Sequence, residues 1–536
     1  MKTPCDEVLV LSGPDAYPCL EAAKPWVLAA TILGSSMAFI DSTVANVALP
    51  ALQRNFSATV TDVQWVVEAY GLTLGALILV GGAIGDIFGR RITFACGVLL
   101  FALASAWCGL APSIQQLIWA RAVQGLGAAF LVPGSLALIS ATFATNQRGR
   151  AIGTWSGFTA ITMAIGPVLG GWLIQHASWR WAFFLNVPIA AAVLLITLWR
   201  VPESRNQSAS RSVDWIGALV VTLGLGGIVY ALVESPILGW RSTLVWISAI
   251  AGLALLVVFY FLERRAANPM LPLRLFQSRT FLGANLLTLF LYAALGEFFF
   301  LVPLDLIQVQ QYSPTGAGAA ILPIILLTFL LARWSGGLVD RYGARRPLII
   351  GPLICAAGFA LCALVGSGQS YWKSLFPAMI TLGVGLAVTV APLTTTVMGA
   401  VDPQFAGTAS GINNAVSRVA GLLSIAVLGI ALVTAFNWRL DLELKVLALP
   451  ENLREEVSAN RSKLAGMEVP ADAPSELARR IDAAIHHSFL FGFRFVLWLL
   501  VCLAVLSSAF AWRMIGQKQQ AFAGDQHAPS LQPNRA

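Results

Sequence analysis

Several charged side chains lie inside long apolar stretches of this 536-residue chain, among them Asp41, Glu68, Arg121 and Glu297. A charge near the centre of a bilayer costs about 2.5–3.5 kcal/mol on insertion scales, so such residues usually mark an ion or substrate pathway. A nearby arginine favours the charged form of a carboxyl group, whereas burial favours the protonated form. A carboxyl group subject to both influences can bind a proton in one conformation and release it in another.

The composition indicates that these charges belong to a membrane protein. Hydrophobic residues make up 57% of the chain and charged residues 11%, compared with about 25% charged residues in soluble domains. Apolar runs of about 20 residues, each long enough to cross a bilayer, recur along the chain. We expect an all-α polytopic membrane protein with 14 spans, at 26–49, 64–85, 92–111, 115–142, 151–174, 181–199, 213–234, 243–263, 280–309, 315–339, 347–366, 372–398, 406–435 and 488–512.

The basic residues predict the orientation of these spans. If the N-terminus is cytoplasmic, the short loops on that side hold fourteen arginines, and the short external loops hold four basic residues. This bias follows the positive-inside rule, so the net charge of +8 does not indicate nucleic-acid binding. The N-terminus lacks the basic start and short apolar core of a cleaved signal peptide. We therefore expect a multi-pass cell (inner) membrane protein with both termini in the cytoplasm.

Two similar turns, at residues 82–91 and 336–346, each join one apolar span to the next. Both read Gly-x-x-x-Asp-x-x-Gly followed by basic residues, and such a repeat is typical of internally duplicated membrane carriers. We expect a gating role, in which charge pairs form when the cytoplasmic side closes and break when it opens. The plainer alternative is a topology signal followed by a turn. The predicted gating residues are Gly82, Asp86, Gly89, Arg90, Arg91, Gly336, Asp340, Gly343 and Arg345.

The duplication also predicts the domain organisation. We expect a cytoplasmic tail at 1–25, a six-helix bundle at 26–199, a linker with two inserted helices at 200–279, a second six-helix bundle at 280–512 and a cytoplasmic tail at 513–536. Within the second bundle, the acidic stretch 436–487 is predicted to be a long, solvated external loop with a short helix from Glu451 to Leu464. Its alternative role is to dock an envelope adaptor protein.

Several motifs resemble those of one transporter family. The turns at 82–91 and 336–346 resemble the conserved cytoplasmic turn of the major facilitator superfamily. Residues 41–50, 121–127 and 166–171 resemble the first-, fourth- and fifth-span motifs of its drug:proton antiporters. Residues 179–188 and 407–418 resemble the 14-span branch, which is typified by the QacA and EmrB exporters. The resemblance covers residues 26–512 and implies a major facilitator fold, with two six-helix bundles and two inserted helices.

Depth along the spans and this resemblance together indicate the site residues. Asp41, Glu68 and Arg121 all lie in the outer half of the membrane, and we expect them to couple transport to protons. An acid beside an aromatic ring suits a lipophilic cation. The predicted substrate-binding residues are Asn46, Tyr70, Glu297 and Phe298. The resemblance implies that an antiport motif, formed by Gly166, Pro167, Gly170 and Gly171, seals the carrier against leak; the alternative is an ordinary kinked helix.

These observations predict a secondary active transporter rather than an enzyme. No lysine follows a glycine, so the chain lacks a Walker A loop for ATP. No nucleophile–base pair and no cysteine or histidine spacing that fits a metal site are present, so we expect no cofactor and no metal. The predicted function is proton-coupled antiport that exports amphipathic or cationic drug-like compounds; the alternative is an uptake symporter or metabolite exporter of the same fold. The expected partners are a small amphipathic substrate, protons and the lipid bilayer.

Overall fold

The structure is a computed structural model of the whole chain. It describes residues 18–143, 145–205, 214–266, 269–364, 370–402, 405–447, 449–470 and 472–516. The predicted tails at 1–25 and 513–536 lie largely outside the described residues.

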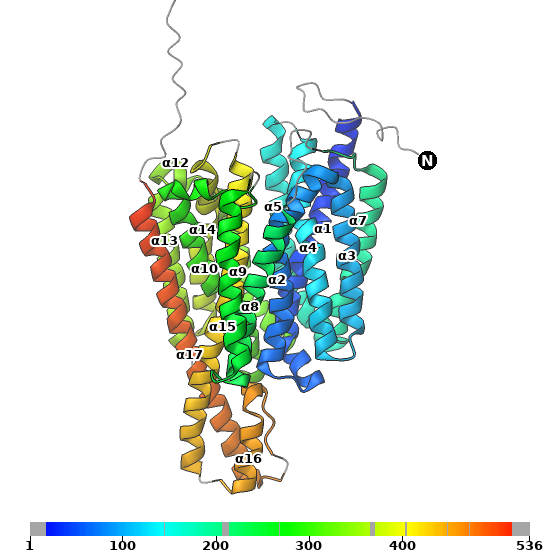
Figure 1. Cartoon of the computed structure of the whole chain (residues 1–536). Coiled ribbons are helices and arrows are strands. Elements are labelled where there is room, and N and C mark those ends of the chain that lie inside the picture. The colour runs from blue at the N-terminus through cyan, green and yellow to red at the C-terminus, as the bar shows by residue number, and fades with distance from the viewer. Residues whose placement is uncertain are drawn as a thin grey trace, which may run out of the picture.

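Helices make up almost all of the described chain (Figure 1). Fourteen of them are long and apolar enough to cross a membrane, and the described residues form no strand. The all-α prediction and the expected number of spans are therefore confirmed. Because a bilayer offers no water to unpaired backbone groups, a helix that satisfies its own backbone is the natural form for each apolar run.

Helices from the first half of the chain pack mainly on one another. Their bounds are α1 (Pro18–Phe56), α2 (Val60–Phe88), α3 (Arg90–Leu110), α4 (Ile114–Thr142), α5 (Thr145–His176), α6 (Arg180–Phe184) and α7 (Asn186–Arg200). The helix α4 packs on α2 and α3, whereas α1 packs on α5 and α7. Glycines permit the closest approach: a Cβ atom added to Gly127 would lie 2.6 Å from the backbone nitrogen of Phe101.

Helices from the second half form the other bundle. Their bounds are η1 (Leu273–Gln277), α10 (Arg279–Leu304), η2 (Asp305–Val309), α11 (Pro314–Gly336), α12 (Leu338–Tyr342), α13 (Arg345–Leu364), α14 (Leu375–Gly399), α15 (Ala406–Leu447), α16 (Glu451–Ala459), η4 (Arg461–Gly466) and α17 (Ser475–Met514). The helix α10 packs on α15 and α17, and α13 packs on α14 and α17. The two bundles meet where α15 packs on α2 and where α11 packs on α5.

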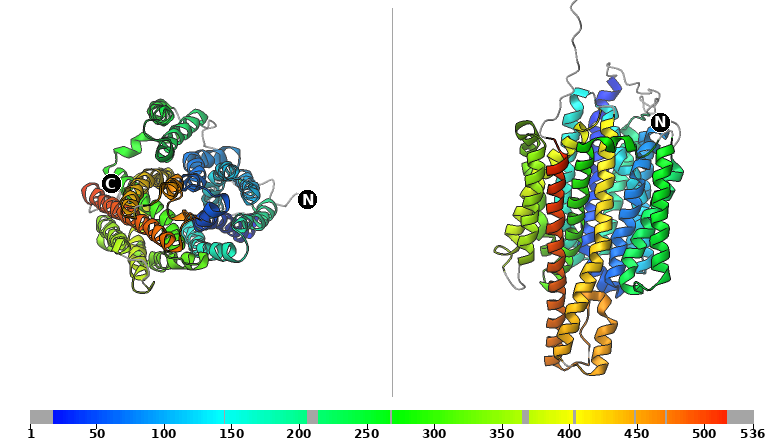
Figure 2. Two further views of the ribbon diagram at one scale, coloured as in Figure 1. Left: turned by 90° about the horizontal axis from the view of Figure 1, so that it is seen from below. Right: turned by 60° about the vertical axis from the view of Figure 1, so that its left-hand side comes forward.

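Two inserted helices, α8 (Trp215–Leu238) and α9 (Thr243–Arg265), lie at the periphery of the two bundles (Figure 2). The helix α8 packs on α2 and α15, and the indole nitrogen of Trp65 donates a 2.7 Å hydrogen bond to Glu234. The helix α9 packs on α8, and its large apolar side chains, such as Ile250 and Leu253, are mostly exposed. An apolar exposed surface on a spanning helix suits contact with lipid.

The first described helix begins and the last one ends at the same end of the molecule, here called the terminal end (Figure 1). At the opposite end, the hairpin end, α15 and α17 extend beyond the other helices and are joined by α16 and η4. Residues 436–487, predicted to be a long loop, are therefore largely helical. The reason is that Phe436 and Leu440 of α15 and Ile481 and Ile485 of α17 are buried, so the two spanning helices continue to pack against each other.

The short helix predicted within this segment begins at Glu451 as expected, but it ends at Ala459. A 3₁₀ helix, Arg461–Gly466, then completes the predicted stretch. Leu453, Val457 and Leu464 are buried, so the segment is anchored by apolar contacts rather than fully solvated.

Candidate functional site

A buried ion pair joins the first and fourth spanning helices. Nη1 of Arg121, on α4, donates to Oδ2 of Asp41, on α1, at 2.5 Å, and each side chain is only 1% exposed. Nε of Arg121 donates to the backbone carbonyl of Val66, on α2, at 3.1 Å. The guanidinium group lies 4.3 Å from the centre of the Tyr70 ring, a cation–π contact. One arginine thus binds α1 and α2 to α4.

Two side-chain amides satisfy the rest of the Asp41 carboxylate. Its Oδ1 accepts hydrogen bonds from Gln124 at 2.7 Å and from Asn186 at 3.0 Å. Both amides also donate to the hydroxyl of Ser105, at 3.2 and 2.9 Å, and Ser105 donates to the carbonyl of Phe183 at 2.9 Å. Both oxygens of the Asp41 carboxylate therefore have hydrogen-bond partners, and the side chain is held in one position by this network.

Three members of this network were absent from the predicted site. Gln124 follows Arg121 by three residues, and that spacing places the two side chains on the same face of a helix, so the signal was present. Asn186 lies within residues 179–188, which resemble a motif of the 14-span branch, but no role was predicted for it. Ser105 lies in an apolar run and carries no signal that distinguishes it from other serines.

Glu68 is not part of the hydrogen-bonded network around Asp41 and Arg121, with which it was predicted to act. Glu68 was expected beside Asp41 and Arg121, but neither of its carboxylate oxygens has a hydrogen-bond partner among the described residues. Glu297, on α10 in the other bundle, has two equally unpartnered oxygens. The side chains are 1% and 0% exposed, respectively, and they act on each other electrostatically. The site therefore has two separate parts: the carboxylate oxygens of Asp41 have hydrogen-bond partners, whereas those of Glu68 and Glu297 have none among the described residues.

The other predicted substrate-binding residues have varied surroundings. Tyr70 is buried beneath the Arg121 guanidinium group, and Asn46 is half-buried on α1. Phe298 is completely buried, and its ring centre lies 5.4 Å from that of Phe359, as in a packed core. A role in substrate binding stays a prediction for all three.

The first twin turn forms its charge pair within itself. Nε and Nη2 of Arg90 lie 2.9 and 2.8 Å from Oδ1 of Asp86. Gly89 between the two helices has a φ of 120°, a conformation that glycine adopts without a steric penalty. The carboxylate of Glu203, which was not predicted as a site residue, accepts hydrogen bonds from the backbone nitrogens of Arg91 at 3.0 Å and Ile92 at 3.2 Å. It thereby caps the start of α3.

The second turn is bonded differently. Nη2 of Arg345 donates to the backbone carbonyl of Trp512 at 2.6 Å, and Gly343 has a φ of 73°. A Cβ atom added to Gly336 would meet no atom of the described residues within 4 Å, and the side chain of Asp340 lies outside what the structure describes. The contacts described at both turns join residues of the same bundle. The gating role predicted for the turns stays a prediction.

The predicted antiport motif lies against both bundles. A Cβ atom added to Gly166 would lie 2.2 Å from Oγ1 of Thr43, and one added to Gly170 would lie 2.5 Å from Cγ1 of Val44. The motif glycines thus let α5 pack against α1 within three residues of Asp41.

On its other face, the same motif meets the second bundle by backbone contact. A Cβ atom added to Gly318 would lie 2.1 Å from the carbonyl oxygen of Pro167, and one added to Gly171 would lie 2.3 Å from that of Pro314. Since α11 begins at Pro314, near the hairpin end, this contact closes the space between α5 and α11 at that end.

The hairpin adds polar contacts to this closure. Nε2 of Gln53, on α1, donates to the backbone carbonyl of Lys463 at 2.9 Å. Its Oε1 accepts a 2.9 Å hydrogen bond from Gln308 of the second bundle. Gln53 is 2% exposed and also packs against Gly466. One side chain of the first bundle is therefore held by two segments of the second.

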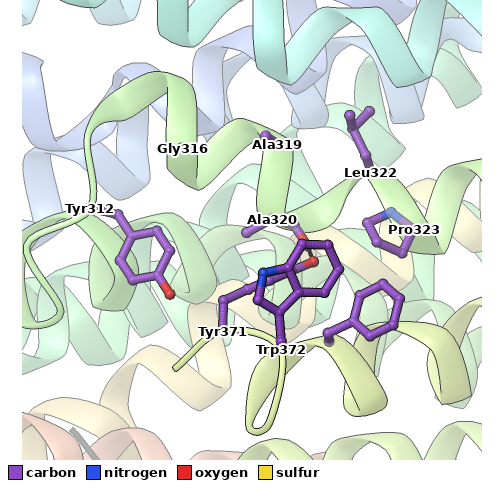
Figure 3. A pocket seen from close by; sticks show the side chains of 9 residues that line it. Tyr312, Gly316, Ala319, Ala320, Leu322, Pro323, Tyr371 and Trp372 are labelled. Atoms are coloured by element: carbon purple, nitrogen blue, oxygen red, sulfur yellow. Dashed lines mark hydrogen bonds between the residues drawn. The ribbon is translucent and has the colours of Figure 1, made fainter. Parts of the chain in front are cut away.

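An aromatic pocket of about 460 Å³ lies apart from these groups (Figure 3). Tyr312, Tyr371, Trp372 and Phe376 line it together with residues of α11. The hydroxyl of Tyr371 donates to the backbone carbonyl of Ala320 at 3.0 Å, and partial burial raises the pKa of that hydroxyl. Trp372 is 68% exposed, so the pocket opens to the surroundings of the second bundle.

Comparison with known proteins identifies the class of protein. The family model described as "Major Facilitator Superfamily" matches residues 31–215 and 210–425. A solved bacterial homolog of the human lysosomal transporter Spinster, in an inward-facing and unoccupied conformation, has the same fold, with a TM-score of 0.63 at 17% identity over 94% of this chain and 99% of that one. The chain belongs to the Major Facilitator Superfamily and is a transporter, not an enzyme.

The curated relatives place it more narrowly. The chain is 36% identical over 501 residues to the "Multidrug resistance protein Stp" of Mycobacterium tuberculosis, with 91% of each chain covered. It is 31% identical over 493 residues to the "Tetracenomycin C resistance and export protein" of Streptomyces glaucescens, again with 91% of each covered. These relatives confirm the predicted resemblance to the 14-span drug exporters.

The buried pair of Asp41 and Arg121 predicts how substitutions change the free energy of unfolding. Replacement of one partner of a buried pair leaves the other charge uncompensated and costs about 3–5 kcal/mol. We therefore expect Arg121→Met to lower the free energy of unfolding by about that amount, and the double variant with Asp41→Asn to recover most of it. Denaturant unfolding of the purified full-length protein in detergent measures both. Glu443→Gln, which removes a more exposed pair with Arg439, should cost no more than about 1 kcal/mol. A free energy of unfolding of Arg121→Met equal to that of the wild type would show that the ion pair does not stabilise the fold.

The backbone contact between α5 and α11 predicts a conformational shift. Gly318→Val places a side chain against the Pro167 carbonyl, and such overpacking costs about 1–3 kcal/mol. That energy changes a two-state equilibrium roughly 5–150-fold, so α5 and α11 should separate at the hairpin end. Spin labels at His176 and Gln311 report the separation as a longer distance. Gly153→Val, at a position of α5 with open space around it, serves as the control, and an unchanged distance in Gly318→Val would refute the contact.

Proposed function

We propose that this transporter is a proton-coupled antiporter that exports amphipathic or cationic drug-like compounds by alternating access. The observation that carries the proposal is the fully buried Asp41–Arg121 network. Charges are retained inside a membrane protein at an energetic cost, which is usually compensated by a function in ion or substrate movement. The names of the two relatives, which describe multidrug resistance and the export of tetracenomycin C, support the direction of transport and the class of substrate.

The geometry suggests how Asp41 would exchange a proton. Three donors, from Arg121, Gln124 and Asn186, occupy both oxygens of its carboxylate in the described conformation. The carboxylate can take up a proton only when some of these donors move away. Since α5 packs on α1 through Gly166, a movement of α5 that opens its contact with α11 also acts on the helix that carries Asp41. Proton uptake and opening would then be linked.

We further propose that the terminal end faces the cytoplasm and the hairpin end faces the outside of the cell membrane. Arg90, Arg91 and Arg345 lie in turns at the terminal end, as the positive-inside rule requires. On this orientation, the contact between α5 and α11 closes the space between the two bundles on the outside of the membrane.

The remaining predicted partners fit this proposal. A substrate, protons and the bilayer suffice for exchange, and no cofactor is needed because the proton gradient supplies the energy. The outward orientation of the hairpin is compatible with the predicted alternative that it docks an envelope adaptor. Exposed acids of α16, such as Glu451 and Glu455, would provide the surface.

Proton coupling is testable in inverted membrane vesicles. With an acidic lumen, we expect vesicles that contain the protein to accumulate ethidium, a fluorescent organic cation. Asp41→Asn should reduce uptake to the rate of vesicles without the protein, because the group that exchanges the proton is lost. Glu443→Gln, in the hairpin, should transport like the wild type. Uptake by the wild type that persists after a protonophore collapses the gradient would sink the proposal.

A further inference from the structure

Glycine contacts bring Glu68 and Glu297 towards the same place between the bundles. Gly71 lies one turn after Glu68 on α2, and a Cβ atom added to it would lie 3.6 Å from Cδ1 of Leu422. Gly296 directly precedes Glu297 on α10, and its added Cβ atom would lie 2.6 Å from Cα of Gly421. Two adjacent residues of α15 therefore touch both carboxylate-bearing helices, close to the two glutamates.

Both carboxyl groups are in an environment that does not satisfy them. None of their four oxygens has a hydrogen-bond partner among the described residues, and both side chains are almost completely buried. The two groups also act on each other electrostatically. Two buried carboxylates without partners are strongly unfavourable, and such sites bind a cation or a proton.

The nearby charged groups do not neutralise the two glutamates. Arg121 is engaged by Asp41 and Gln124. Arg418 of α15 lies beside Gly75, which is seven residues, or about 10 Å, further along α2 than Glu68. Arg418 lies within electrostatic range of Tyr70 and Tyr292, but it donates no hydrogen bond to either glutamate. Asp305, on η2 towards the hairpin end, adds a further acid rather than a counter-charge.

We propose that Glu68 and Glu297 form one cation site shared by the two bundles and separate from the Asp41–Arg121 network. The site takes the positively charged group of a lipophilic organic cation, and a proton competes for it. The occupant is lipophilic because the neighbouring side chains, such as Leu422, are apolar. This inference rests on the proposed function, since it names the substrate class, and it assigns cation selectivity to residues other than the proposed coupling pair.

The site has a structural consequence. Because one carboxyl group comes from each bundle, a bound cation or proton removes the repulsion that would otherwise oppose their approach. Closure at the hairpin end therefore requires an occupant between the two glutamates. An empty, doubly charged site favours separation of α2 and α10, and release of the occupant and opening then accompany each other.

Equilibrium binding of ethidium to the purified full-length protein in detergent tests the site without any gradient. At pH 8 we expect Glu68→Gln and Glu297→Gln each to weaken binding about tenfold, which corresponds to about 1.4 kcal/mol. The loss of ethidium affinity in the double variant should be smaller than the product of the two single losses, because the two groups act as one site. Glu234→Gln is the matched control: it removes an acid of α8 that is bonded to Trp65, and it should bind like the wild type.

Competition with the proton gives a second readout. Wild-type binding should weaken as the pH is lowered and should release a proton into a weakly buffered solution, and neither effect should occur in the double variant. Ethidium affinity that is unchanged in both single variants would overturn the proposal, as would absence of binding to the wild type. If the glutamine variants do not fold, Glu68→Asp and Glu297→Asp, which keep the charge, should retain proton release, and its loss there would equally overturn the proposal.

These outcomes are independent of the test of proton-driven export. Failure of Asp41→Asn to abolish gradient-driven uptake would refute the proposed coupling and leave the binding results intact. Conversely, normal ethidium binding by both glutamine variants, together with gradient-driven uptake that depends on Asp41, would refute the shared site and leave the antiport proposal standing.

Discussion

The buried pair of Asp41 and Arg121 is the interaction on which the arrangement of the first bundle depends. Neither charge can be left unpaired in the membrane interior, so α1 and α4 must lie where the two side chains meet. The remaining donors and acceptors then have to come from elsewhere. Val66 of α2, Ser105 of α3 and Asn186 of α7 provide them, and five helices are joined around one charged group.

The chain handles its buried acids in two different ways. Asp41 is surrounded by donors and is stable without an added ligand. Glu68 and Glu297 have no donor within the part of the chain that the structure describes, and they come from different bundles. A saturated network holds a bundle together, whereas an unsatisfied pair responds to whatever cation is present. The Asp41 network thus maintains the fold, whereas Glu68 and Glu297 have carboxylate oxygens that can bind a cation.

Contacts between the bundles combine packed apolar side chains with close approach of the backbones. Gly171 and Gly318 let α5 and α11 touch through main-chain atoms, and Gln53 adds hydrogen bonds to the hairpin and to Gln308. Such contacts are made or broken as a unit because rigid helices carry them. A small set of contacts of this kind suits a molecule whose two halves must move relative to each other.

The sequence by itself determined the membrane class, the number of spans, the duplicated turns and the position of each buried charge along its helix, because apolar run length and position along a helix are local properties. It did not determine which way each side chain points around its helix. Depth alone grouped Glu68 with Asp41 and Arg121, whereas in the described structure Glu68 forms no hydrogen bond with either residue and interacts electrostatically with Glu297 of the other bundle. Helix packing also places Ser105 in the Asp41–Arg121 network. It extends α15 and α17 beyond their apolar runs into the hairpin. Only the tertiary structure decides these features, since they depend on contacts between helices that are far apart in the chain.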